Sequence, residues 1–171
     1  MLIAVDPGNV RSAYVVWDGR QITDKGLVDN EVLRGRLIAL KGQASLVIEM
    51  IASYGMAVGY EVFDTCVWIG RFTEIFGGNV VPVFRKDIKM HLCHSMKAND
   101  ANIRRAILDR CPSTGGGACP QVGTKLNPGP LFGVKKDIWA ALAVLIYFLG
   151  TQARDEASMN FLETHSRGGR Q

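Results

Sequence analysis

The chain has 171 residues, enough for one domain with a sizeable core, and its net charge of +4 and content of 47% hydrophobic and 21% charged residues are those of a soluble globular protein. The longest apolar run, residues 138–150, is too short to span a bilayer, which argues against a membrane protein. Asp6 and Arg11 interrupt the N-terminus too early for a signal peptide, so we expect a cytoplasmic protein whose four cysteines are reduced thiols.

Three consecutive strands are predicted at the N-terminus. Residues 2–6 form an apolar run that suits a strand buried on both faces, and strands at 12–17 and about 21–28 follow it. Asp18-Gly19 is a strong signal for a hairpin turn between the second strand and the third. We therefore expect the chain to open with three antiparallel strands.

Strands and helices alternate in the rest of the chain. Asn30 can cap a helix that runs to about Leu40, and Pro82 favours an edge position for the strand that contains it. The elements expected after that helix are a strand at 44–49, a helix at 58–76, a strand at 79–84 and a short helix at 87–93. Asn99 or Asp100 is expected to cap a further helix. A Gly- and Pro-rich loop at 111–130, either functional or disordered, and a helix at 136–150 complete the chain up to the tail. This order predicts an α/β fold: a five-stranded mixed sheet with helices on both faces, formed by residues 1–150 as a single domain, with residues 151–171 as a flexible C-terminal tail.

Basic residues concentrate in one part of the chain. Residues 85–136 contain ten basic and three acidic side chains, so the remainder of the chain is slightly acidic. Such asymmetry indicates a polyanionic partner, with nucleic acid as the first candidate. An ordinary solvated basic face is the alternative.

Three acidic residues stand at the ends of apolar segments. Asp6 closes the first strand and is followed by Pro7 and Gly8, Glu49 closes a later strand, and Asp137 opens the most apolar helix. Taken singly, a strand-end acid can be solvated, and an acid at a helix start is favoured by the helix dipole. An acid that follows buried strand residues costs free energy unless it is paired or coordinated, so the three together indicate one shared site.

Carboxylates from two strands and one helix suit a particular chemistry. Carboxylate oxygens are hard ligands that Mg²⁺ prefers, and two such ions about 4 Å apart can activate a water and stabilise the leaving 3′ oxygen of a phosphodiester. The pattern therefore predicts a Mg²⁺-dependent site for phosphodiester cleavage at Asp6, Glu49 and Asp137.

The same segments resemble those of a known family. Residues 6–8 (Asp-Pro-Gly), 47–49 (Val-Ile-Glu) and 137–143 (Asp-Ile-Trp-Ala-Ala-Leu-Ala) look like the motifs of RuvC-type Holliday junction resolvases, most of all the phage-encoded RuvC-like group, within the RNase H/retroviral-integrase superfamily. The resemblance spans about residues 1–149. It implies an RNase H-like fold and a homodimeric endonuclease of a bacterial or phage-infected cytosol. Such an enzyme uses Mg²⁺ or Mn²⁺ to nick two strands symmetrically across a four-way DNA junction, in recombination, repair or phage DNA processing. By motif match, Asp6, Glu49 and Asp137 are its catalytic residues and metal ligands.

One position departs from the family pattern. Bacterial RuvC proteins carry a further Asp three residues into the terminal helix, where this chain has Ala140. Either three carboxylates suffice or another acid contributes; Glu61 and Asp64 share a helix face but are more simply solvent-facing. A ribonuclease for RNA–DNA hybrids and a non-catalytic module that binds branched DNA are therefore alternative functions. An actin-like or sugar-kinase-like ATPase needs a second, larger domain than this chain can provide.

Several side chains are candidates for DNA contact: Tyr54, Arg85, Lys86, Lys89, Lys97, Lys135 and Lys136. The basic residues from 85 to 97 lie where the phosphate-contacting segment of the family runs. Lys135 and Lys136 precede Asp137 and either clamp a phosphate or are simply solvated. Tyr54 either stacks on an unpaired base at a junction centre or packs over the sheet.

Two further features concern metals and partners. The histidines and cysteines between residues 91 and 119 do not have a spacing that is typical of structural zinc sites. The helix at 58–76 is apolar over a wide arc that includes Val62, Trp68, Ile69 and Phe72, which makes it a candidate dimer surface.

Overall fold

The order of the elements follows the prediction in the computed structural model, which describes residues 1–52, 55 and 57–166, and of residues 154–166 the backbone alone. The strands are β1 (Leu2–Asp6), β2 (Arg11–Trp17), β3 (Ile22–Asp29), β4 (Ser45–Met50) and β5 (Val80–Phe84). The helices are α1 (Asn30–Leu40), α2 (Tyr60–Phe76), α3 (Arg85–Cys93), α4 (Asp100–Arg110) and α5 (Ile138–Ser166).

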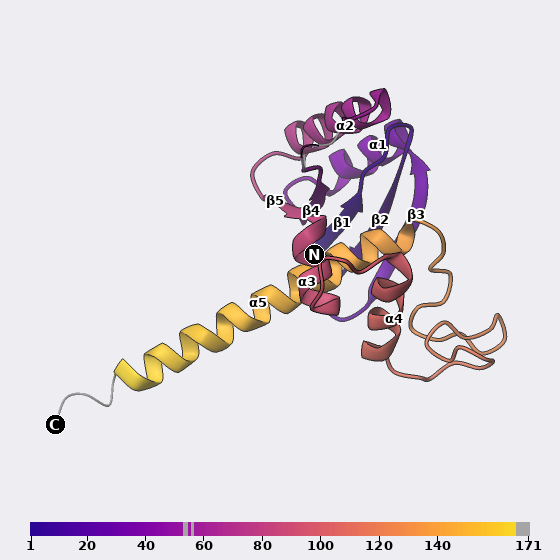
Figure 1. The fold of residues 1–171 in the computed structure, drawn as a ribbon, viewed down its shortest axis with the longest axis vertical. Helices are drawn as coiled ribbons and strands as arrows, with labels where there is room; N and C mark the ends of the chain where they lie inside the picture. The colour runs from indigo at the N-terminus through magenta and orange to yellow at the C-terminus, as the bar shows by residue number, and fades with distance from the viewer. Residues whose placement is uncertain (53–54, 56, 167–171) are drawn as a thin grey trace.

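The five strands form one mixed sheet in the order β3-β2-β1-β4-β5 (Figure 1). β1 and β2 pair antiparallel, as do β2 and β3, whereas β4 pairs parallel with β1 and β5 pairs parallel with β4. The predicted RNase H-like sheet is therefore confirmed. Pro82 lies in β5 at the edge of this sheet, where a strand needs ladder hydrogen bonds on one side only.

The central strand β1 explains why both faces of the sheet are covered. Successive side chains of a strand point to opposite faces, and Ile3 and Val5 pack with α1 and α2 while Leu2 and Ala4 pack with α5. The helices α3 and α4 lie on the same face as α5, and α1 and α2 lie on the other (Figure 1). Since apolar side chains are buried on both sides, the strand reads as a continuous apolar run.

Most element boundaries differ from the prediction by one or two residues, and the differences at three helices matter most for the site and the shape of the chain. Helix α3 begins at Arg85, directly after β5, instead of at Asp87. Asn30 is the first residue of α1, and the capping position belongs to Asp29. Helix α5 was expected to end at Gly150 but continues to Ser166, because good helix formers follow and no proline or glycine stops it; its C-terminal part projects beyond the sheet (Figure 1). The division into a domain at 1–150 and a flexible tail stays a prediction, and residues 167–171 lie outside the described residues.

The long loop between α4 and α5 is organised by its own backbone. Gly115 N–H donates to the carbonyl of Pro120 (2.8 Å), and Gly129 N–H donates to that of Val122 (3.0 Å). A Cβ atom on Gly123 would lie 2.2 Å from the nitrogen of Gly129, so this crossing requires glycine. Hydrogen bonding of this kind speaks against disorder of the loop, which leads the chain back to the start of α5.

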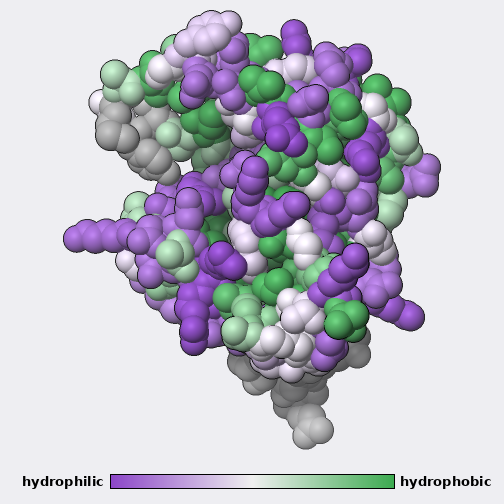
Figure 2. All heavy atoms as spheres, turned by 90° about the vertical axis from the view of Figure 1, so that its right-hand side faces the viewer, coloured by the Kyte–Doolittle hydropathy of each residue, from purple (hydrophilic) through white to green (hydrophobic). Residues whose placement is uncertain are grey.

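The surface seen from the right-hand side of Figure 1 is covered largely by hydrophilic side chains, with smaller apolar patches between them (Figure 2). Among the described residues, no helix combines the length and the apolar character that crossing a membrane requires. All four cysteines are free thiols.

Candidate active site

Asp6 is the last residue of β1, and Glu49 is the penultimate residue of β4, the neighbouring parallel strand. The register of β1 and β4 places each acid one position beyond the last pair of residues that the two strands share. Because side chains alternate along a strand, the acids point to the same face as Ala4 and Val47, which pack in the cluster under α5. Both carboxylates therefore lie at the carboxyl end of the sheet, on the face that α5 covers.

The turn that follows Asp6 is held by hydrogen bonds that centre on two buried side chains, those of Ser12 and Asn30. The hydroxyl of Ser12 donates to Oδ1 of Asn30 (2.6 Å), the amide of Asn30 donates to the carbonyl of Gly8 (2.9 Å), and Gly8 N–H donates to Ser12 Oγ (3.2 Å). Ser12 and Asn30 are 0% and 2% exposed. A Cβ atom on Gly8 would lie 2.4 Å from the carbonyl oxygen of Arg11, so the turn itself requires glycine at this place. These contacts fix the backbone that carries Asp6.

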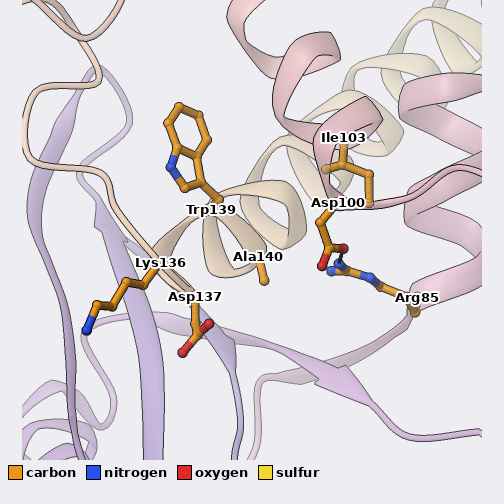
Figure 3. Close-up of a pocket in the computed structure, with 7 residues that line it drawn as sticks. All are labelled: Arg85, Asp100, Ile103, Lys136, Asp137, Trp139 and Ala140. Carbon is orange, nitrogen blue, oxygen red and sulfur yellow. Dashed lines mark hydrogen bonds and ion pairs between the residues drawn. The ribbon is translucent and has the colours of Figure 1, made fainter.

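Asp137 approaches the same region from the N-terminus of α5. Its carbonyl oxygen accepts hydrogen bonds from the N–H groups of Ala140 (2.9 Å) and Ala141 (3.2 Å), which form the first turn of the helix. Lys136 has a left-handed backbone with φ of 50°, an uncommon conformation for a residue other than glycine, and it turns the chain from the loop into α5. The side chain of Asp137 is exposed and extends from the helix on a different side from Trp139 (Figure 3).

The pKa of Asp6 shows that the acids interact. Burial is the main cause that raises this pKa from 3.8 to about 8, and the negative charge of Glu49 is the next. Arg85 opposes the rise, while Asp137 and Asp100 add smaller increases. Glu49 and Asp137, the other two acids that the sequence placed in this site, therefore lie within electrostatic reach of Asp6, and so does Asp100.

Arg85 connects the two sides of the site. It follows β5 directly, and β5 pairs with β4 so that Phe84 lies beside Met50, the residue after Glu49. One guanidinium nitrogen of Arg85 lies 3.3 Å from Oε2 of Glu49, and the other donates to Oδ1 of Asp100. Burial raises the pKa of Glu49, and the charge of Arg85 opposes that rise. The side chain expected to contact DNA is thus engaged by two carboxylates.

Two hollows in the surface share Arg85 as a wall. Asp6, Glu49 and Arg85 line one of them. The other is lined by Arg85, Asp100, Asp137 and Ala140, with the carboxylate of Asp100 against the guanidinium (Figure 3). The residues that the sequence assigned to catalysis are therefore divided between two adjoining hollows.

The donor set has the chemistry of a site for a hard divalent cation. It consists of carboxylates, and Mg²⁺ prefers oxygen ligands and keeps several of its waters, so it needs few protein ligands. Within the described residues, however, no three His, Cys, Asp or Glu side chains lie close enough together to hold a single metal ion. The residues therefore suit a divalent cation in the type of ligand that they offer, although the acids are not gathered into a tight cluster.

The basic candidates flank the acids on both sides. Lys89 of α3 lies near enough to Glu49 for its charge to lower the pKa of that carboxyl. Lys86 and Lys97 are exposed, the first on α3 and the second before α4. Tyr54 falls outside the described residues.

Lys135 and Lys136 line a further hollow beside Asp100, together with Arg104 and Trp139. The guanidinium carbon of Arg104 lies 4.7 Å from the centre of the Trp139 ring, a cation–π contact. Sequence reasoning missed both Arg104 and Asp100. A basic residue on a helix and an acid in its first turn are ordinary features, and no local signal marks them as part of a site.

Comparison with known proteins gives a fold. No protein-family model matches the sequence. No curated protein matches it. Among solved structures, RuvC of T. thermophilus in complex with a Holliday junction substrate is similar, with a TM-score of 0.54 and 14% identity over 85% of this chain and 90% of that chain. A structure of Thermus thermophilus RuvC has a TM-score of 0.51 and 13% identity over 88% of this chain and 96% of that one. The chain therefore has a RuvC-like fold, and its assignment to the phage-encoded group stays a prediction.

Proposed function

We propose that this chain is a metal-dependent endonuclease that resolves Holliday junctions or other branched DNA by paired nicking, in recombination, repair or phage DNA processing. The observation that carries the proposal is that Asp6 and Glu49 lie side by side at the carboxyl end of a RuvC-like sheet, with Asp137 near enough for its charge to act on Asp6. Buried or mutually repelling carboxylates beside a surface hollow are typical of functional sites rather than of stabilising ones.

Asp6, Glu49 and Asp137 are the proposed catalytic residues and metal ligands, with Mg²⁺ as the cofactor and Mn²⁺ as a substitute. Two bound ions of this kind supply an activated water and stabilise the leaving 3′ oxygen of the cleaved strand. The chain contributes the positions of its carboxylates: strand pairing and the Asn30 contacts fix Asp6, and the ion pair with Arg85 orients Glu49. Because the pKa of Asp6 is about 8, this carboxyl gives up a proton when a cation binds.

The basic side chains are the proposed contacts to the phosphate backbone: Arg85, Lys86, Lys89, Lys97, Lys135 and Lys136. Lys89 approaches the acids from α3, and Lys135 and Lys136 lie on the opposite flank, before α5. A strand held between them would pass over the carboxylates. Tyr54 is proposed to stack on an unpaired base.

The four-way junction is the first candidate substrate because a RuvC structure of the same fold was solved with a Holliday junction. Such recognition depends largely on phosphate contacts, so the affinity of this chain for a junction should fall steeply with salt.

Paired nicking requires two active sites, and helix α2 offers a surface on which two copies can meet. Tyr60, Phe63 and Val67 follow helical spacing and are 77%, 58% and 51% exposed. Ile69 and Phe72, which the sequence suggested for this surface, are instead buried in the core beneath α2. We therefore propose the stripe of three exposed residues as the contact of a homodimer.

A second function, a non-catalytic module that binds branched DNA, is favoured by two observations. Position 140 carries no carboxylate, and the described residues contain no tight group of metal-ligating side chains. In that case the basic residues bind branched DNA, and the acids cleave no phosphodiester bond.

One cleavage experiment separates these functions. The purified chain is incubated with Mg²⁺ or Mn²⁺ and a panel of a four-way junction, a three-way junction, a flap, a linear duplex and an RNA–DNA hybrid, and the nicks are mapped. Paired symmetric nicks in the four-way junction are expected. Cleavage confined to the hybrid would show a ribonuclease, and tight junction binding without any cleavage would show the non-catalytic module.

A further inference from the structure

Asp100 is an acid at the candidate site for which the sequence suggested only the role of a helix cap, a role that Asn99 takes in the structure. It is the first residue of α4, and a capping box fixes its backbone: Asn102 N–H donates to the side chain of Asn99, and Asn99 N–H donates to that of Asn102, both at 3.0 Å. The side chain of Asp100 is 87% exposed. Its backbone is therefore held in place while its carboxylate stays accessible from solvent.

Glu49 and Asp100 hold one cation between them. The guanidinium of Arg85 contacts Oε2 of Glu49 through one nitrogen and Oδ1 of Asp100 through the other. The side chains of Arg85 and Glu49 are 27% and 14% exposed, so the contact to Glu49 is partly shielded from water. Two carboxylates that share the single positive charge of Arg85 retain a net negative charge. A divalent cation between them would neutralise both carboxylates.

Asp100 also faces the acid of α5. Asp100 and Asp137 line the same hollow, and between them the wall is formed by the methyl group of Ala140, which offers no oxygen (Figure 3). Through Arg85, whose guanidinium also contacts Glu49, Asp100 is connected to the strand side of the site as well.

We propose that Asp100 is a further metal ligand of this site, and that Arg85 holds the cation position between Glu49 and Asp100 that a divalent ion takes over. The inference rests on the proposed metal-dependent function. An ion held there would displace the guanidinium from Glu49, and Arg85 would then be free to contact a phosphate of the DNA, as its place among the proposed phosphate contacts suggests.

The competing explanation is that Asp100 only positions Arg85, or only stabilises the first turn of α4 through the helix dipole. Asp109 provides a matched control, because it is an exposed aspartate of the same helix whose partner is Arg105, four residues before it. Neutralising Asp109 removes the same charge from α4 without touching the site.

The test is the affinity for Mn²⁺, measured by calorimetry and by the electron paramagnetic resonance of the free ion, on the full chain. Asp100→Asn is expected to weaken Mn²⁺ binding roughly 10–100-fold and Asp109→Asn less than about twofold. Arg85→Gln is expected to tighten binding, because it removes the competing cation. In the Arg85→Gln background, Asp100→Asn should still weaken binding, since a ligand acts on the ion and not through Arg85. Arg85→Met, which also removes the positive charge, replaces Arg85→Gln if that variant does not fold.

Equal Mn²⁺ affinities of the Asp100→Asn and Asp109→Asn variants would overturn the inference. So would an effect of Asp100→Asn that disappears once Arg85 is replaced, because Asp100 would then be a positioning residue only. Cleavage assays on the same proteins separate the two proposals. A wild-type chain that binds Mn²⁺ through Asp100 but nicks no substrate would contradict the nuclease function alone. A chain that nicks junctions with an Mn²⁺ affinity independent of Asp100 would contradict this inference alone.

Discussion

The two sides of the candidate site are built in different ways. On the strand side, Asp6 and Glu49 lie at the carboxyl ends of paired strands, are largely buried, and have raised pKa values. On the helix side, Asp100 and Asp137 stand at the first turns of α4 and α5 with exposed side chains. Arg85 lies between the two sides and contacts one acid on each: Glu49 on the strand side and Asp100 on the helix side.

The difference teaches how a fold can carry a cluster of like charges. The strand side has a rigid backbone, and burial disfavours the charged form of its carboxyls. The raised pKa values of these carboxyls are the result. The helix side keeps its carboxylates in water, where a charge costs little, and its positions depend on a capping box and a left-handed turn at Lys136. A cation that enters from solvent would meet the exposed carboxylates first, and the buried carboxylates would then complete its coordination shell.

The largest expected effect is on the strand side. Asp6→Asn should reduce nicking of a four-way junction by roughly 10³-fold or more, the scale that is typical when a group acting directly on the reaction is removed. The affinity for the junction, measured by gel shift with Ca²⁺, should stay within about threefold, because the phosphate contacts come from basic residues. Asp109→Asn serves as the control and should nick like the wild type. Cleavage by Asp6→Asn at the wild-type rate would exclude the proposed chemistry.

The support beneath Asp6 should be the next most sensitive point. Asn30→Ala removes one buried and one partly buried hydrogen bond and leaves the carbonyl of Gly8 without its partner, so it should lower the free energy of unfolding by about 2–3 kcal/mol. Urea denaturation measures this change. A loss below about 0.5 kcal/mol would mean that the turn after Asp6 is held by strand pairing alone.

The pKa of Asp6 makes metal binding on the strand side dependent on pH. A carboxyl with a pKa of about 8 carries a proton at neutral pH, and a cation must displace that proton, so affinity rises as the pH rises toward and past this value. Mn²⁺ should bind roughly tenfold more tightly at about pH 8.5 than at about pH 7, with release of a proton that calorimetry in buffers of different ionisation enthalpy can count. Asp6→Asn should flatten this dependence. An affinity that is equal at both pH values in the wild type would show that Asp6 does not take part in binding.

The smallest expected effect is on the helix side. Asn99→Ala removes the capping side chain of α4, which should cost about 1 kcal/mol of stability in urea. Because the backbone of Asp100 loses its anchor, Mn²⁺ affinity should fall a few-fold, less than after removal of the Asp100 carboxylate itself. If Asn99→Ala lowered the free energy of unfolding as much as Asn30→Ala, the proposed difference between a buried, rigid strand side and an exposed, adjustable helix side would be wrong.

Local signals were sufficient for most of the fold. The apolar runs gave the five strands, Pro82 indicated the sheet edge, and Asn99 was one of two residues expected to cap α4. The end of α5 was missed, because an apolar pattern stops at Gly150 while helix propensity continues to Ser166. Asn30 was expected to cap a helix, and its buried side chain instead bonds to Ser12 and Gly8 across the β1–β2 turn.

The sequence by itself determined the three acids as candidates, since an acid at the end of a buried strand or at a helix start is visible in a few neighbouring residues. Only the tertiary structure decided what lies between them. Arg85 is 36 residues from Glu49 and 15 from Asp100, and no rule of local spacing brings these three together. Parallel pairing of β5 with β4 carries Arg85 to Glu49, and packing of α4 against α3 and α5 carries Asp100 to Arg85. Contacts between segments distant in the chain arise from how the sheet and its helices pack, which is why the fourth acid and its guanidinium partner became visible only in the folded molecule.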